Sequence, residues 1–202
     1  MVKNLLTTEE KILDAAKKVF HCKGFEGARM QEIADEADIN KALLHYYFRT
    51  KENLFNAVFK AAFGEIFAKL FMTIDSNEPL EKKLKNLINE YIGFLQENSY
   101  IPGFILAEMN QNPQKILEIF KSAPVPPSML FERMKESIQD EKLVNTDVRE
   151  LFINILALCI FPFAAKPMLQ YVFEFSDIQY DQFIEKRKKE LPILIMNTIK
   201  KK

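Results

Sequence analysis

The chain has 202 residues, with 28 basic and 28 acidic side chains and a net charge near zero. This length allows one large domain or two small ones with a real core, and an apolar share of 48% argues against a disordered chain. A neutral chain is not expected to coat nucleic acid or an acidic membrane with its whole surface, so any polyanion-binding role must be local.

Helices are the expected secondary structure throughout. Only 5 glycines stand against 18 phenylalanines, many of them at three- and four-residue spacing, which is typical of helices rather than of strands and hairpins. Cys22 and Cys159 lie far apart and the N-terminus shows no signal-peptide pattern, so we expect a cytoplasmic protein. The longest apolar run, 151–165, contains Asn154 and Pro162 and is shorter than the roughly 20 residues that span a bilayer. It predicts a buried helix bent at the proline, and no membrane partner.

The first helix is expected to begin at the segment TTEEKIL. Thr7 followed by Glu10 forms a capping box, in which each residue's side chain pairs with a free backbone N–H of the other. Gly24 stands where a left-handed C-cap is expected. The apolar stripe between these two ends consists of Ile12, Ala16, Val19 and Phe20.

Two shorter helices follow. One is expected over 30–37, and after a tight turn Asn40 is a good N-cap for another over 41–48. In this third helix Leu44 and Phe48 are four residues apart and are expected to face the core.

Beyond residue 50 the pattern predicts longer helices separated by breaks. Thr50 caps the first of them, Pro79 is expected in the first turn of the next, and the segment APVPPS is the clearest loop. Bends are expected near Pro162, Pro167 and Pro192. The predicted helices cover 51–72, 79–95, 102–110, 113–121, 128–141, 146–173 and 179–200, and the whole chain is predicted to be all-α.

The segment 39–54, INKALLHYYFRTKENL, is the first indication of function. Between Asp38 and Glu52 it contains no acid. Three short helices with a tight turn before the last describe a helix-turn-helix unit, which places its last helix in the major groove of DNA. An acid there would face phosphates that carry one charge per about 1.7 Å of duplex. The alternative is an ordinary solvated face with long basic side chains.

The residues from Glu9 to about Phe59 resemble the DNA-binding domain of the tetracycline-repressor (TetR-like) family of bacterial regulators. The matching pieces are ILDAA..VF..KGF, then M.EIA..A, then K..L..YF..K..L. The resemblance covers about the first quarter of the chain. It implies an all-α fold with an N-terminal helix-turn-helix domain over 1–50 and a helical ligand-binding and dimerisation domain over 51–202.

Several positions depart from the family's pattern. Ala28 and Arg29 stand where the family commonly has Thr or Ser, and Asp38 stands in place of Gly. Asn40 replaces Ser or Thr but keeps the capping chemistry. Gly at position 42 and Tyr at position 45 are replaced by Ala and His. These changes alter the reading surface, so the operator sequence is not transferable from relatives.

Carried over by position, the resemblance implies a set of DNA-contacting residues. Gln31 and Lys41 are candidates for base edges, because Gln can pair with adenine and Lys can reach guanine acceptors. His45, Tyr47 and Lys51 are expected to hold phosphates. His45 is expected to gain a proton there; as alternatives, the neutral ring donates one N–H or packs on a tyrosine. The full set is Arg29, Gln31, Asn40, Lys41, Ala42, Leu43, His45, Tyr46, Tyr47 and Lys51.

The resemblance implies that the remaining three quarters form a homodimer through the last two long helices and hold a small-molecule effector. Aromatic and methionine side chains at helical spacing belong to a core more often than to a pocket, so both readings stay open. A pocket would take a largely apolar or amphipathic ligand, with Asn89, Gln96, Glu108 and Asn154 available for a polar end. The basic run 186–189, KRKK, is interpreted as a solvated face. The candidate pocket residues are Phe63, Phe67, Tyr91, Phe94, Phe104, Met109, Phe120, Met134, Phe152 and Phe161.

Rival functions are weaker. His21 and His45 are the only histidines, and no metal-ligand spacing, glycine-rich phosphate loop or serine elbow appears, so neither an enzyme nor a cofactor or metal is expected. A helical protein-interaction adaptor would share the pattern but would not need an acid-free helix. A nucleoid-type protein would bind DNA without sequence preference or ligand. The favoured hypothesis is a ligand-responsive transcriptional repressor that binds a palindromic operator.

Overall fold

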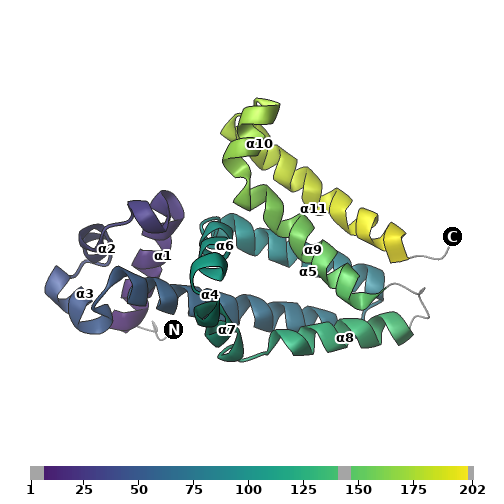
Figure 1. Ribbon diagram of the computed structural model, residues 1–202, viewed down its shortest axis with the longest axis horizontal. Helices are drawn as coiled ribbons and strands as arrows, with labels where there is room; N and C mark the ends of the chain where they lie inside the picture. The colour runs from purple at the N-terminus through teal and green to yellow at the C-terminus, as the bar shows by residue number, and fades with distance from the viewer. Residues whose placement is uncertain (1–6, 141–146, 200–202) are drawn as a thin grey trace, which may run out of the picture. The chain divides into compact units, whose positions relative to one another are not determined.

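Residues 7–140 and 147–199 are described by the computed structural model, and within these ranges the chain forms eleven α-helices and no strand (Figure 1). The all-α prediction is confirmed. The chain divides into two compact units, Met1–Phe63 and Gly64–Lys202. The helix ends predicted at 141, 146 and 200 lie outside the described residues.

Local capping determines the ends of the first helix. The backbone N–H of Thr7 donates to the Glu10 carboxylate at 2.7 Å, and the N–H of Glu10 donates to the Thr7 hydroxyl at 3.3 Å, so the capping box is confirmed. Gly24 has the expected positive φ, +68°, but its ψ of 178° is not that of a left-handed cap; one further turn follows it, and the C-cap of α1 is Ala28. The N-terminal unit consists of α1 (Thr8–Gly27), α2 (Met30–Glu36), α3 (Lys41–Phe48) and the first part of α4 (Lys51–Ile74).

Aromatic rings fill the core of the N-terminal unit. The ring of Phe55 in α4 lies 4.8 Å from that of Phe20 and 5.0 Å from that of Phe25, centroid to centroid. Leu44 and Phe48 of α3 are buried as predicted. This packing joins the end of α1 to the start of α4, and it leaves the opposite side of α3 to the solvent.

The helix α4 belongs to both units. Its first turn is capped as predicted, because the Thr50 hydroxyl accepts the N–H of Asn53 at 3.1 Å. The boundary between the two units falls inside the helix, between Phe63 and Gly64. One continuous helix therefore links the helix-turn-helix to the rest of the chain.

The C-terminal unit has its core between α5, α9 and α11, which pack on one another. Pro79 directly precedes α5 rather than lying in its first turn, and Pro127, expected in the loop, is the first residue of α8, where no backbone N–H is needed. The helices are α5 (Leu80–Glu97), α6 (Ile101–Gln111), α7 (Pro113–Lys121), α8 (Pro127–Asp140), α9 (Val148–Ala164), α10 (Lys166–Phe173) and α11 (Asp177–Ile199).

The single bent helix predicted over 146–173 is two helices, α9 and α10, that meet at an angle of 71°. The break follows Ala164, whereas Pro162 lies inside α9. A proline lacks the N–H that would bind the carbonyl four residues earlier, here that of Leu158. Arg187 of α11 supplies the missing donors, with its Nε at 3.0 Å and a terminal nitrogen at 2.9 Å from that carbonyl oxygen. The helix α9 therefore continues through the proline.

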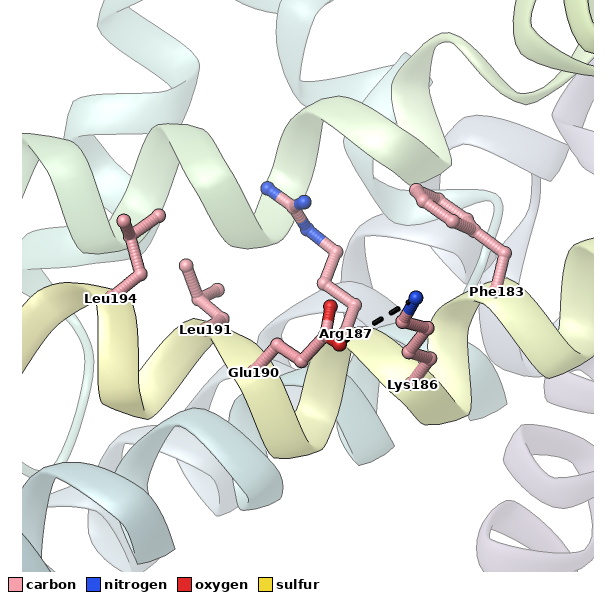
Figure 2. Close-up of a pocket in the computed structure, with 6 residues that line it drawn as sticks. All are labelled: Phe183, Lys186, Arg187, Glu190, Leu191 and Leu194. Atoms are coloured by element: carbon pink, nitrogen blue, oxygen red, sulfur yellow. Dashed lines mark ion pairs between the residues drawn. The ribbon is translucent and has the colours of Figure 1, made fainter.

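This contact corrects the interpretation of 186–189 as a purely solvated face. Figure 2 shows Arg187 pointing from α11 toward the neighbouring helix, while Lys186 pairs with Glu190 along the surface at 3.6 Å. Lys188 pairs with Glu185 at 3.0 Å. Lys186 and Lys189 are exposed as predicted, whereas Lys188 and Arg187 are half-buried and the arginine binds the backbone.

Within the described ranges, no single helix has the length and apolar character needed to cross a membrane. The helices α9 and α10 reach that length and apolar character only when they are counted together, across the 71° bend between them. In the same ranges no group of three or more His, Cys, Asp or Glu side chains is placed to hold a metal ion. Both cysteines are free thiols: Cys22 is exposed, and Cys159 is buried in the C-terminal core.

Candidate nucleic-acid interface

The helix α3 has one buried face and one exposed face. Leu44 is fully buried, whereas Tyr46 is 81% exposed and Tyr47 is 40% exposed. The two tyrosine rings contact each other edge to face, with centroids 5.6 Å apart. Lys41, Ala42 and His45 are also exposed, and Leu43 is half-buried. The outward face thus carries hydrogen-bonding rings, a lysine and small apolar groups, but no carboxylate.

Two of the three acids of the neighbouring helix α2 are held by lysines from α1. Glu32 accepts a hydrogen bond from Lys23 at 2.8 Å, and Glu36 accepts one from Lys18 at 2.8 Å. The hydrogen bond from Lys23 holds the pKa of the Glu32 carboxyl below its usual value. Such surface pairs add little stability, but they neutralise these two acids. The acid-free face is therefore not opposed by unpaired carboxylates of α2 at these two positions.

Of the two DNA-contacting residues predicted at the start of α2, one lies at the N-cap and the other has its side chain bound within the helix. Arg29 precedes the helix as its N-cap and is exposed. Gln31 is exposed too, but its amide nitrogen donates to Asp35 at 2.8 Å. A two-bond pair with adenine needs both the oxygen and the nitrogen of that amide. The bond to Asp35 uses one of the two hydrogens on that nitrogen, so the other hydrogen and the amide oxygen of Gln31 remain for such a pair.

Asn40 has a local structural function. Its side-chain oxygen accepts the backbone N–H of Leu43 at 2.8 Å, which confirms the predicted N-cap. The cap determines where α3 begins and hence which side chains its first turn presents. Asn40 thereby positions Lys41 and Ala42 at the exposed N-terminal end of the helix.

The C-terminal end of α3 is closed by two reciprocal hydrogen bonds between His45 and Arg49. The backbone N–H of Arg49 donates to the carbonyl of His45 at 2.9 Å, and Nδ1 of His45 lies 2.8 Å from the carbonyl oxygen of Arg49. Arg49 has a φ of +51°, which is rare for a residue with a side chain. The ring contact helps to hold this conformation, and it fixes the orientation of the imidazole on the exposed face.

Lys51 is bound within the N-terminal unit. Its ammonium donates to the carbonyl of Phe25 at 2.9 Å and lies 3.4 Å from those of Glu26 and Ala28. The same nitrogen lies 4.5 Å from the centroid of the Phe25 ring. Carbonyl groups at a helix end lack partners inside the helix and attract cations. Lys51 thus satisfies the C-terminal end of α1, a function that the sequence did not predict.

Most of the candidate pocket residues are buried or half-buried. Phe67 and Phe120 contact each other with centroids 6.4 Å apart, and burial raises the pKa of the Tyr91 hydroxyl above its ordinary value. Met109 and Phe161 are more than half exposed and are not brought together with the others. Three of the others are buried, namely Phe63, Phe104 and Met134, and Phe63 belongs to the N-terminal unit. The half-buried ones are Phe67, Tyr91, Phe94, Phe120 and Phe152.

A second surface lies along α9 and α11. Ile153 and Phe161 of α9 and Ile193 and Leu194 of α11 are each more than half exposed. Beside α11 there is a pocket of about 330 Å³. Figure 2 shows its lining, with apolar side chains at both ends and the charged residues between them: Phe183, Lys186, Arg187, Glu190, Leu191 and Leu194.

The sequence reasoning missed two features of the helix-turn-helix. Arg49 lies in the acid-free segment, and its basic character was visible, but nothing local indicated that its carbonyl would orient His45. The carbonyl partners of Lys51 lie 23 to 26 residues earlier in the chain. Only the glycine at position 24, which ends the regular part of α1 and leaves carbonyl groups unpaired, hinted at the need for a donor there.

Comparison with known proteins agrees with this geometry. The family model of bacterial regulatory proteins of the tetR family matches residues 12–58. The chain is 24% identical over 181 residues to the probable HTH-type transcriptional regulator YttP of Bacillus subtilis, covering 88% of this chain and 84% of the relative. It is 37% identical over 87 residues to the HTH-type transcriptional repressor NicS of Pseudomonas putida, covering 42% and 41%. The solved structure of the regulator FadR from Bacillus subtilis in complex with stearoyl-CoA is similar in fold, with a TM-score of 0.66, 20% identity, and coverage of 92% and 96%.

Proposed function

The chain is a helix-turn-helix transcriptional regulator of the TetR family, and from this premise we propose that it binds a palindromic operator as a homodimer and is released by a small effector. The family assignment makes it a DNA-binding regulator and not an enzyme. The observation that carries the proposal is the exposed, acid-free face of α3. We place its action in the bacterial cytoplasm, where operators are found.

In the proposed complex α3 lies in the major groove. Lys41 reaches guanine acceptors, and Ala42 and Leu43 meet thymine methyl groups. Gln31 reads adenine with its amide oxygen and the N–H that does not bind Asp35. The other members of the set, Arg29, Tyr46, Tyr47 and His45, hold phosphates, whereas Asn40 and Lys51 position the reading helix.

We assign dimerisation to α9 and α11. Their exposed apolar side chains are too numerous for two lone surface helices, and pairing them with a two-fold mate would form a four-helix bundle. A two-fold dimer also brings two recognition helices to half-sites about one turn of DNA apart, which is why the operator should be palindromic. On this proposal the pocket beside α11 is covered by the second copy.

The proposed effector is apolar or amphipathic, and a long-chain acyl thioester is the class that we favour. The aromatic interior of the C-terminal unit supports an apolar tail, and a regulator of the same fold has been solved with stearoyl-CoA. In the division that we propose, residues 1–50 bind DNA and residues 51–202 bind effector and partner. The helix α4, which belongs to both units, would transmit the effect.

Selection of bound fragments from random duplex DNA tests the DNA half of the proposal. A palindromic consensus is expected, bound by two chains in sedimentation and with an affinity that falls steeply as salt rises. Gln31→Ala should change the preferred base at one position of each half-site, while Leu194→Asp, on the proposed dimer face, should give a folded monomer that binds a full site weakly. Recovery of unselected sequences by the intact chain would instead indicate a nucleoid-type protein.

Titration with stearoyl-CoA tests the effector half, with free coenzyme A and stearate as controls. For ligand to release DNA it must bind the off-DNA conformation more tightly, and a 100-fold preference corresponds to about 2.7 kcal/mol. The expected result is loss of the operator complex at the same stoichiometry at which the thioester binds. If thioester binding leaves operator affinity unchanged, the acyl-thioester assignment is wrong.

A further inference from the structure

The hydrogen bonds at the end of α3 determine which nitrogen of His45 carries the proton. The carbonyl oxygen of Arg49 can only accept, so the Nδ1 atom 2.8 Å away must be the donor. A neutral imidazole has one N–H. With that N–H used on Nδ1, the Nε2 of neutral His45 carries a lone pair and no hydrogen.

This tautomer decides what His45 can do on DNA. A phosphate oxygen is an acceptor and needs a donor, which the Nε2 of the neutral ring is not. The imidazolium, in contrast, donates from both nitrogens at once. We propose that His45 is a proton-dependent phosphate ligand, an inference that rests on the proposed operator binding. The ring keeps its bond to Arg49 and contacts the DNA backbone through Nε2–H only in the charged form. Each half-site therefore takes up one proton.

The charges around His45 fit this function. On α3 and its C-terminal end, Lys41 precedes His45 by one turn and Arg49 follows it by one turn, and both are exposed cations. Among the charged groups of the adjoining helix α2, the carboxylates of Glu32, Asp35 and Glu36 already accept hydrogen bonds from Lys23, Gln31 and Lys18, and Arg29 adds a cation at its N-cap. In the first turn of α4, Lys51 binds backbone carbonyls and Glu52 is exposed. Asp38, in the turn before α3, is exposed as well, and no ion pair joins Asp38 or Glu52 to His45 among the described residues. In the proposed complex the DNA phosphate brings the negative charge that stabilises the imidazolium.

The direction of the pH dependence follows from linkage. If the bound state holds more protons than the free state, lowering the pH favours binding. Each proton taken up raises the association constant by up to about tenfold for each pH unit by which the pH is lowered. A dimer with two His45 contacts therefore gains up to about a hundredfold per pH unit. The effect belongs to the range near pH 6.5, where an ordinary histidine changes its charge.

The variant His45→Asn separates the proton from the local structure. An asparagine amide nitrogen occupies nearly the place of Nδ1 and can still donate to the Arg49 carbonyl, but the side chain does not titrate. His21→Gln is the matched control, because His21 is the only other histidine and lies exposed on α1. Circular dichroism of each variant checks that the helices are intact.

The measurement is the affinity of the full chain for the tightest duplex selected from a random pool, between pH 6 and pH 8 at constant ionic strength. The wild type and His21→Gln should bind more tightly as the pH falls, and His45→Asn should show a flat profile. If the affinity of His45→Asn still depends on pH, or if the affinity of the wild type does not, the inference about His45 is overturned. Neither result contradicts the proposed operator binding. A wild-type chain that retains no duplex at any pH refutes the proposed function as well.

Discussion

Replacing Lys51 by methionine should destabilise the N-terminal unit rather than weaken a phosphate contact. The sequence places this lysine at the foot of α4, where a phosphate ligand is expected, but its ammonium is bound to the end of α1. Methionine keeps most of the apolar stem and removes only the charge and its donors. The substitution therefore isolates the polar contacts.

The structure allows the size of the effect to be worked out. A hydrogen bond from a charged donor contributes about 1.5–3 kcal/mol, and the bond from Lys51 to Phe25 has good length at 2.9 Å. The two contacts at 3.4 Å are weaker. The ammonium over the Phe25 ring adds about 0.5–1 kcal/mol at a partly exposed site. Because water can reach part of this end of α1, the expected loss in the free energy of unfolding is about 2 kcal/mol.

Lys41→Met is the matched control, since Lys41 is an exposed lysine on the reading helix. Urea denaturation followed by circular dichroism should show the loss of stability in Lys51→Met and a change within about 0.5 kcal/mol in Lys41→Met. Operator binding should show the reverse, with weaker affinity and a relaxed preference at one base position of each half-site for Lys41→Met, and an unchanged salt slope for Lys51→Met. If Lys51→Met keeps full stability and flattens the salt slope, the lysine contacts a phosphate and our reasoning is wrong.

Two further predictions concern the C-terminal core. Arg187→Met should lower the free energy of unfolding by about 2 kcal/mol, because it leaves the Leu158 carbonyl without a donor. In a Pro162→Ala background, where the backbone N–H is restored, the same substitution should cost less than half as much, and a double-mutant cycle measures the difference. Burial raises the pKa of the Cys159 thiol to about 12, so at pH 8 a thiol reagent should modify only exposed Cys22 until the chain is unfolded. Rapid modification of both thiols in the native chain would contradict the buried placement of Cys159.

The features predicted best from the sequence are those determined within a few residues. The capping box of Thr7 and Glu10 and the N-cap of Asn40 are confirmed, and α3 has the predicted bounds. Each depends on a side chain and a backbone group three or four positions away, so the local sequence contains both partners. The buried face of α3 follows in the same way from the spacing of Leu44 and Phe48.

The candidate pocket shows where helical periodicity fails. Periodicity identifies an apolar face, but it does not tell whether that face points into its own unit or outward to another surface. Phe152 is half-buried against the C-terminal core, whereas Phe161, on the same helix, is 55% exposed. Met109 is likewise 52% exposed. Helical spacing alone therefore predicted the same pocket location for side chains that are half-buried and for side chains that are exposed.

The contacts of Arg187 and Lys51 have a common physical cause. A proline inside a helix, or the end of a helix, leaves backbone carbonyls without partners, and the sequence reveals that need at Pro162 and after Gly24. It does not reveal the donor, which comes from 29 residues away in one case and from 23 to 26 in the other. In both cases a cation that pattern reasoning assigned to the surface supplies the bond. A basic residue in a regulator of this kind is therefore assigned to DNA only after the unpaired carbonyls of its own fold have been matched with donors.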